Sequence, residues 1–456
     1  MDTKKLRQKI LDLAIHGKLV PQDPNDEPAS VLLERIKVEK EQLIKEGKIK
    51  RSRKSAKTSD TPHYEQVKLE VPNSWYMVSV SDLFLLNPKS ELDDNMKVGF
   101  IPMALVEDGF SGNHFYEERT WKDVKRGYCH FQNGDIGIAK ISPCFENRKS
   151  TIFKNLPNTY GAGTTELVIL RPIKVYTKFY LYLFKSDWYV KEGTKYFKGV
   201  VGQQRVHKEI FTDLHIPLPP FAEQQRIVEE IEYWFALIDQ IEQDKSDLQT
   251  AIRQTKSKIL DLAINGKLVL QNPNDEPASE LLKRINPKAE ITCGNGHYPQ
   301  LPDWWVVVPM QMLCSLTDGE KLDGKEMPNL DVKYLRGERD FKTQTNGRYV
   351  AANSLLILVD GENSGEVFRT PIEGYQGSTF KQLHINENML AEYILHVINL
   401  HRKALRENKV GSAIPHLDKK LFKAIEVPVP PYDEQVRIVT VINSMHSKLD
   451  AIMENL

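Results

Sequence analysis

The sequence has few cysteines and lacks long apolar runs. Its 456 residues include four cysteines and no CxxC pair, which favours a reducing compartment and gives no metal site. No apolar run is long enough to span a bilayer, and the N-terminus lacks the apolar segment of a signal peptide. We therefore expect a cytoplasmic protein with no membrane partner.

Motifs for catalysis and nucleotide binding are also missing. The sequence contains no GxxxxGK[ST] loop for ATP, no HExxH and no GxSxG. LPPF (218–221) and VPPY (429–432) resemble the (N/D)PP(Y/F) site of amino-methylating DNA methyltransferases. However, Leu218 and Val429 cannot accept the hydrogen bond that this site needs, and each proline pair stands where a helix would begin. We expect no catalytic residue, no metal and no cofactor in this chain.

Neither sign of charge is in excess. The 62 basic residues balance 62 acidic ones, which argues against a protein that is basic all over but permits local basic patches. Residues 37–57 carry nine Lys or Arg against three Glu. This segment suits a solvated helix with a linker or, alternatively, an arm that binds phosphates.

What the sequence does contain is a long internal repeat. Residues 9–36 match residues 258–285 at 23 of 28 positions, and both copies include PNDEPAS. Asp26 and Asp275 of this phrase are candidate caps of the short helices expected at 29–36 and 278–285. A second pair, IPLPPFAEQQRIV (216–228) and VPVPPYDEQVRIV (427–439), recurs after 211 residues instead of 249. Between these segments the two halves diverge. The chain therefore contains two copies of one framework, and each copy encloses a segment of different sequence.

The framework predicts long helices. Apolar residues recur at alternating intervals of four and three, with two interruptions, at Ile227, Ile231, Trp234, Ile238, Ile241, Leu248, Ile252, Ile259 and Leu262. This pattern is typical of a coiled-coil seam, and it lies between the proline pair at 219–220 and a C-cap at Gly266. By the two offsets, the C-terminal segment repeats the first half of this helix and the N-terminal segment repeats its second half. We expect a circular pseudo-two-fold repeat whose ends lie close together and whose split helix packs antiparallel against the central one.

Strand-like and helical segments alternate within each half. In the first half, residues 133–150 and 164–172 predict strands and residues 178–193 predict a helix. In the second half the matching segments are 353–370, 374–385 and 387–405. The expected fold class is α+β, with two similar α/β-type domains separated by two long antiparallel coiled-coil helices.

Basic and amide side chains near glycine-containing loops are the candidates for DNA contact. Arginine can bridge guanine, glutamine can bridge adenine, and lysine can neutralise phosphates. The candidates are Lys140, Arg148, Lys149, Lys198, Gln203, Gln204, Arg205, Arg336, Arg339, Lys342, Arg369, Lys381, Gln382 and His416.

The framework resembles the specificity subunit of type I restriction–modification enzymes. The resemblance rests on LPPFAEQQRIV and VPPYDEQVRIV before the long helices and on KILDLAI with PNDEPAS after them, and it covers essentially the whole chain. GQQRV (202–206), TTELVILRP (164–172) and GENSGEVF (361–368) are similar to phrases of its target recognition domains. The second half departs from this pattern at SAIPH (412–416), which stands in place of GQQRV.

The resemblance implies a non-catalytic subunit that recognises a bipartite sequence in double-stranded DNA. Target recognition domains are expected at 64–220 and 287–431. Conserved helical regions are expected at 1–36, 221–286 and 432–456, with a basic linker at 37–63. The implied partners are two modification subunits, which carry the methyl donor, and restriction subunits, which use ATP.

Two other functions stay open on the residues alone. A self-contained DNA methyltransferase would need a cryptic cofactor site, and binding of the methyl donor by the purified chain would favour it. A protein-binding coiled-coil scaffold would show no preference among DNA sequences.

Overall fold

The protein divides into two compact units, Met1–Gln243 and Asp244–Leu456. The computed structural model describes residues 2–47, 69–195, 197, 199, 204–287, 298, 300–407 and 416–456. The division falls inside helix α7, Phe221–Ile264, whose 44 residues correspond to a length of about 66 Å. The long helix predicted after the first proline pair is therefore confirmed.

The first unit combines helices with short strands. Its helices are α1 Thr3–Ile15, α2 Ala29–Lys45, α3 Val80–Leu83, α4 Trp121–Val124, α5 Thr177–Phe184 and α6 Asp187–Thr194, with 3-10 turns at Met103–Leu105, Pro157–Thr159 and Lys208–Phe211. Its strands are β1 Tyr76–Ser79, β2 Phe84–Leu86, β3 Lys97–Ile101, β4 Glu117–Thr120, β5 Cys129–Gln132, β6 Ile136–Ala139, β7 Ser150–Ile152, β8 Tyr160–Gly163, β9 Leu167–Pro172 and β10 His215–Leu218. Helix α2 extends past residue 36, so the linker predicted at 37–63 begins as helix; residues 48–63 lie outside the described residues.

Two four-stranded sheets form the body of the first unit. One has the antiparallel order β2-β9-β6-β7, and the other has the order β4-β3-β8-β5 with a parallel β3–β8 pair. Strand β6 is buried along its whole length, as expected for an apolar strand inside a sheet. A ribbon of β1 and β10 brings the start and the end of the domain together, with Tyr76 opposite Leu218.

The second unit contains a comparable set of elements. Its helices are α8 Ala278–Ile285, α9 Met310–Leu313, α10 Val332–Leu335, α11 Ala391–Glu407, α12 Lys419–Ala424 and α13 Tyr432–Glu454. Its strands are β11 Val306–Pro309, β12 Cys314–Thr317, β13 Lys321–Leu330, β14 Lys342–Val350, β15 Leu355–Leu358, β16 Val367–Arg369, β17 Gly374–Gln376, β18 Phe380–Ile385 and β19 Glu426–Val429. The α+β class is confirmed in both units.

The central sheet of the second unit repeats the topology of the first. Its order is β12-β18-β15-β16, and β11 pairs with β19 as β1 pairs with β10. The other layer differs, because β13, β14 and β17 close into a small barrel instead of an open sheet. One scaffold therefore carries two different surfaces.

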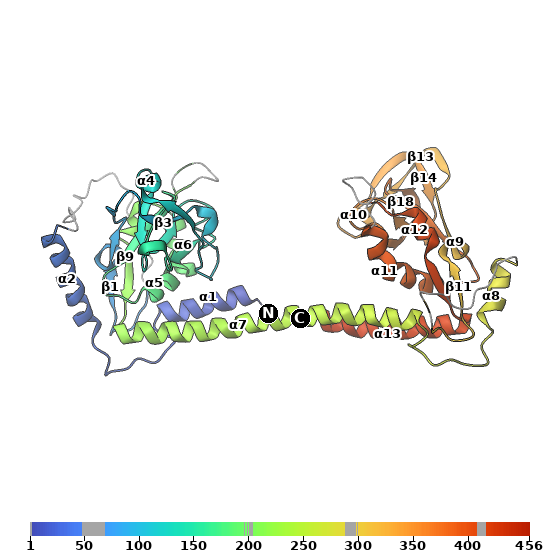
Figure 1. Cartoon of the computed structure of the whole chain (residues 1–456), viewed down its shortest axis with the longest axis horizontal. Coiled ribbons are helices and arrows are strands. Elements are labelled where there is room, and N and C mark those ends of the chain that lie inside the picture. Colours follow the sequence, from blue (N-terminus) through green and yellow to red (C-terminus); the bar gives the residue numbers. More distant parts are fainter. Residues whose placement is uncertain are drawn as a thin grey trace. The chain divides into compact units, whose positions relative to one another are not determined.

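In each unit a second helix lies antiparallel along α7 (Figure 1). In the first unit, Arg7 of α1 pairs with Asp239 and Glu242, and Gln22 beyond α1 reaches Glu223. In the second unit, Lys256 of α7 pairs with Asp450 of α13, and Gln271 beyond α7 reaches Glu434. Lys256 and Asp450 are the repeat counterparts of Arg7 and Asp239, so the same helix register recurs. The chain ends belong to different units, and their predicted closeness stays a prediction.

The apolar seam of α7 is only partly covered. Ile227, Ile231 and Ile238 join the core of the first unit, and Ile259 joins that of the second. Trp234, Ile241 and Leu248 of the same seam are 41–44% exposed. Among the described residues, no helix is both long and apolar enough to cross a membrane.

Candidate nucleic-acid interface

The two repeated motifs meet in space and join the first domain to α7 and the second domain to α13. The first joint consists of Gln22, Asp26, Trp75, Glu223 and Arg226. Trp75 Nε1 donates to one carboxylate oxygen of Glu223 at 2.9 Å, and Gln22 Nε2 donates to the other. Arg226 donates to both carboxylate oxygens of Asp26, at 2.9 and 2.6 Å. PNDEPAS therefore supplies an acid that binds the arginine of EQQR.

The second joint has the same chemistry and consists of Gln271, Asp275, Trp305, Glu434 and Arg437. Trp305 Nε1 and Gln271 Nε2 donate to the two oxygens of Glu434 at 3.1 and 2.7 Å. Arg437 donates to Asp275 at 3.3 and 2.6 Å. The near-identity of the repeated segments therefore follows from a matched set of contacts that fix each domain to its helices.

The acids of the joints differ in their electrostatics. The hydrogen bond from Arg226 lowers the pKa of the Asp26 carboxyl group. Burial raises the pKa of the Glu223 and Glu434 carboxyl groups, and the tryptophan and glutamine donors oppose that rise. Each joint thus combines an ion pair with a buried acceptor that depends on two neutral donors.

Asp26 and Asp275 also invite interpretation as caps of the short helices that follow them, and that interpretation is wrong. The N-cap positions of α2 and α8 are Pro28 and Pro277, and neither cap makes a side-chain hydrogen bond. The two carboxylates are occupied by arginines that lie far away in sequence. Gly266 does serve as the predicted C-cap, with φ +65° and its N–H bonded to the carbonyl of Ala263.

In the first domain, some of the predicted DNA-contact residues hold loops of the fold. Arg148 is 12% exposed at its side chain, pairs with Asp187, and donates from Nε to the Lys185 carbonyl at 3.0 Å. Lys149 Nζ donates to the carbonyls of Met103 and Val106 at 3.3 and 2.9 Å. The guanidinium and the ammonium group are thus already engaged by the domain itself.

Three other predicted residues of this domain, Lys140, Gln204 and Arg205, lie near the end of β6. Lys140 follows β6 and is half-buried, and the backbone carbonyl of the half-buried Gln204 accepts from Ser142 N at 2.8 Å. Arg205 is exposed and donates to Glu166 at 2.8 Å. Lys198 and Gln203 lie outside the described residues.

In the second domain, most of the predicted basic side chains are paired with carboxylates. The pairs are Arg336 with Glu366, Arg339 with Asp331, Arg369 with Glu392, Lys381 with Asp318 and His416 with Asp360. Lys342 is exposed at the start of β14. Gln382 is buried, and its Nε2 donates to the Tyr349 carbonyl at 2.7 Å.

Arg205 and His416 occupy equivalent places in the two units. Each lies in a segment that forms an antiparallel bridge to the residue two positions beyond the central strand, Ile141 after β6 and Asp360 after β15. Each side chain is also paired with a carboxylate, Glu166 for Arg205 and Asp360 for His416. Arg205 of GQQRV and His416 of SAIPH therefore occupy the same position of the fold with different chemistry.

Sequence reasoning missed two basic residues beside these candidates. Arg348 pairs with Asp318 at 2.9 Å, next to Lys381. Lys89 lies close enough to Cys129 that its charge, like that of Lys140, favours the thiolate. Burial outweighs both charges and raises the Cys129 pKa to about 12, so this thiol stays protonated. No motif marks Lys89 or Arg348, because only the fold brings them to these positions.

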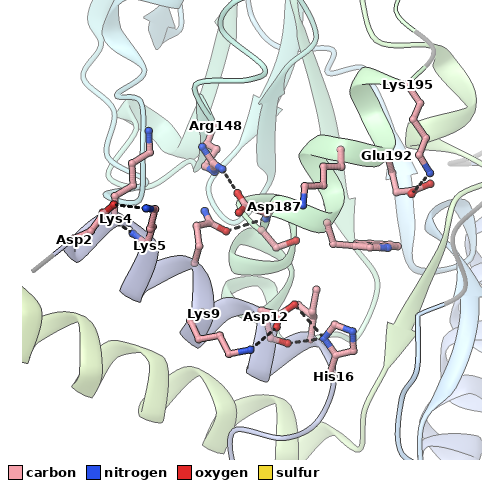
Figure 2. Close-up of a pocket in the computed structure, with 15 residues that line it drawn as sticks. Asp2, Lys4, Lys5, Lys9, Asp12, His16, Arg148, Asp187, Glu192 and Lys195 are labelled. Atoms are coloured by element: carbon pink, nitrogen blue, oxygen red, sulfur yellow. Dashed lines mark hydrogen bonds and ion pairs between the residues drawn. The ribbon is translucent and has the colours of Figure 1, made fainter.

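A groove of about 720 Å³ lies between α1 and α6 of the first unit (Figure 2). Many of the residues that line it are charged, among them Lys4, Lys5 and Lys9 of α1 and Asp187 and Lys195 on the α6 side. Among the described residues, no group of histidine, cysteine and acidic side chains is arranged to hold a metal ion.

The sequence matches the family model described as "Type I restriction modification DNA specificity domain" at residues 72–250 and 304–456. The chain belongs to this family. It is 43% identical over 419 residues to the EcoAI specificity subunit of Escherichia coli, covering 79% of this chain and 70% of that protein. It is 41% identical over 326 residues to the EcoEI specificity subunit of the same species, covering 62% of this chain and 54% of that protein.

Solved structures share the fold at low sequence identity. One comes from work on complex assembly and conformational transition of the type I R-M system, with a TM-score of 0.60, 16% identity, and coverage of 84% of this chain and 93% of that one. Another is the HsdS subunit of Thermoanaerobacter tengcongensis, with a TM-score of 0.52, 15% identity, and coverage of 85% of this chain and 92% of that one.

Proposed function

We propose that this chain is the DNA-recognition subunit of a type I restriction–modification complex and that it directs its partners to a bipartite target. The carrying observation is the double match to the DNA specificity family, at 72–250 and 304–456, on two domains with the same central sheet order. A shared sheet order would present the two proposed reading surfaces alike, while their side chains differ. Each domain then reads one part of the target.

Base reading is assigned to the cations and amides that the sequence singled out. Arg205 and His416 are the leading pair, because they are exposed at equivalent positions and each is oriented by a carboxylate. An oriented guanidinium suits the two acceptors of guanine in the major groove. Arg148 and Lys149, whose donors are engaged inside the fold, would shape the reading loops instead.

The framework would act as a ruler between the two parts of the target. The recurring ion pairs of α1 and α13 with α7, together with the matched joints, support a circular pseudo-two-fold repeat with antiparallel coiled-coil helices. The separation of the two half-sites would then depend on how rigidly each domain is fixed to its helices.

Two modification subunits are the proposed protein partners, with restriction subunits joining through the complex. Trp234 and Ile241 on α7 and their repeat counterparts Met445 and Ile452 on α13 are all 41–47% exposed. Exposed apolar side chains at repeated positions suit two copies of one partner. The methyl donor and ATP would bind on the partners, and this chain would supply no catalytic residue.

Methylation mapping of DNA from cells that carry this chain and its partners tests the proposal. We expect one asymmetric sequence made of two short parts and a spacer of fixed length. Modification of one continuous sequence would contradict it. Methyl transfer by the purified chain alone would instead favour a self-contained methyltransferase, and the absence of any sequence preference would favour a scaffold.

A further inference from the structure

A completely buried lysine, Lys185, lies where the first domain contacts α1. Lys185 follows α5, and its exposed fraction is 0%. Its Nζ donates to the carbonyl oxygens of Gly109 at 2.8 Å and Arg148 at 3.0 Å. One side chain therefore ties the loop before β4 to the loop before β7. A lysine in an interior persists only where such acceptors surround it.

The backbone around Lys185 is held in turn by α1. Gln8 Nε2 donates to the Lys185 carbonyl at 3.2 Å, and the amide of Asp187 donates to Gln8 Oε1 at 2.9 Å. Arg148 donates to the same Lys185 carbonyl. It also pairs with Asp187 (Figure 2). We call Gln8, Arg148, Lys185 and Asp187 the clamp.

An aromatic contact extends the clamp to α7. The Arg148 guanidinium lies 5.7 Å from the ring centre of Phe110. The ring centres of Phe110 and of Phe235 on α7 are 5.8 Å apart. Arg7 of α1 covers Phe235 at 5.7 Å. The loops of the domain thus rest on both helices through contacts that are separate from the first joint.

We propose that the clamp positions the first recognition domain on α1 and α7 and thereby restricts the spacer lengths that the complex accepts. This inference rests on the proposed function. Contacts with α7, such as Trp75 with Glu223 and Lys178 with Glu232, attach the domain along one helix. The clamp adds directional hydrogen bonds to a second helix, since Gln8 lies near the middle of α1. Hydrogen bonds to both helices restrict a rotation of the domain about α7 that contacts with α7 alone would restrict less.

The second unit is built differently at the corresponding place. The repeat counterpart of Gln8 is Ser257, which is exposed on α7. At the repeat counterpart of Phe235, the ring centre of His446 on α13 lies 6.2 Å from that of His396 on α11. Ser257 therefore offers a matched control for Gln8.

The test uses the complex reconstituted from this chain and its modification subunits. Its methylation rate on DNA with the cognate half-site spacing is compared with its rate on DNA whose half-sites lie one base pair closer or farther apart. We expect Gln8→Ala to reduce the ratio of cognate to off-length rates about fivefold, the factor that one net hydrogen bond represents. Lys185→Met is expected to act in the same direction, and Ser257→Ala to leave the ratio unchanged.

The outcomes separate the two proposals. The clamp is overturned as a positioning device if Gln8→Ala leaves the ratio of cognate to off-length methylation rates unchanged. This holds whether both rates stay as in the wild type or both fall by the same factor. An equal effect of Ser257→Ala also overturns it. If the wild-type complex responds to neither half-site, the proposed function itself fails. If Lys185→Met does not fold, Gln8→Ala alone decides the inference.

Discussion

Replacing the buried Lys185 by methionine should change how the stability of the chain depends on pH. Burial, with a smaller contribution from the positive charge of Arg148, lowers the Lys185 pKa from its ordinary 10.5 to about 7. Between these two values the unfolded chain binds a proton that the folded chain does not. The free energy of unfolding therefore rises with pH in this window. Methionine binds no proton, so the variant lacks this contribution.

The expected size follows from the shift. In the middle of the window, the wild-type free energy of unfolding should rise by about 1.4 kcal/mol for each pH unit relative to Lys185→Met. Because the folded lysine is still half protonated near pH 7, the gain from pH 7 to pH 9 comes to about 2 kcal/mol. Below pH 7 the difference between the two proteins should become flat.

Urea denaturation of both proteins at a series of pH values measures this difference, and other titrating groups cancel between them. Lys4→Met, at an exposed position of α1, controls for the loss of a lysine charge. A difference between wild type and Lys185→Met that stays constant from pH 6 to pH 9, or that falls, would refute the assignment of a buried, largely neutral lysine.

Three further predictions concern the joints and the reading surfaces. Gly266→Ala should lower the free energy of unfolding by about 3 kcal/mol, because Gly266 has φ +65° and an added Cβ would lie 2.5 Å from Pro302. In the same urea assay the control Gly47→Ala, at φ +70° with open space around it, should lower it by only about 1 kcal/mol. Asp275→Asn should cost about 2 kcal/mol, since it weakens the bond to Arg437 at a carboxylate that is only 4% exposed, and Asp26→Asn should match it closely by calorimetry. Arg205→Ala should relax base preference in one part of the target and leave the other part unchanged, as measured by methylation of substituted sites.

The framework could be predicted from the sequence because its signals are local and occur twice. The apolar intervals of α7, the proline pair before it and Gly266 after it each identify an element without reference to distant residues. Asp26 was harder to interpret. Its carboxylate is 200 residues away in sequence from its partner Arg226, so a local capping role was the only one that the sequence suggested.

Which of the candidate side chains the fold engages internally could not be predicted, because charge does not reveal burial. Arg148 and Lys149 are basic like the other candidates, yet the fold directs their donors to its own carbonyls. Lys185 carried one usable signal, since it ends the apolar run FYLYLF (179–184). Its two acceptors lie on loops 76 and 37 residues away, which no spacing pattern indicates.

The most direct test of bipartite recognition exchanges residues 64–215 for the matching region of the EcoAI specificity subunit and maps methylation by the resulting complex. The proposed function predicts that one part of the recognised sequence changes while the other part stays as in the wild type. A change in both parts, or in neither, would contradict the assignment of one reading domain to each half of the target.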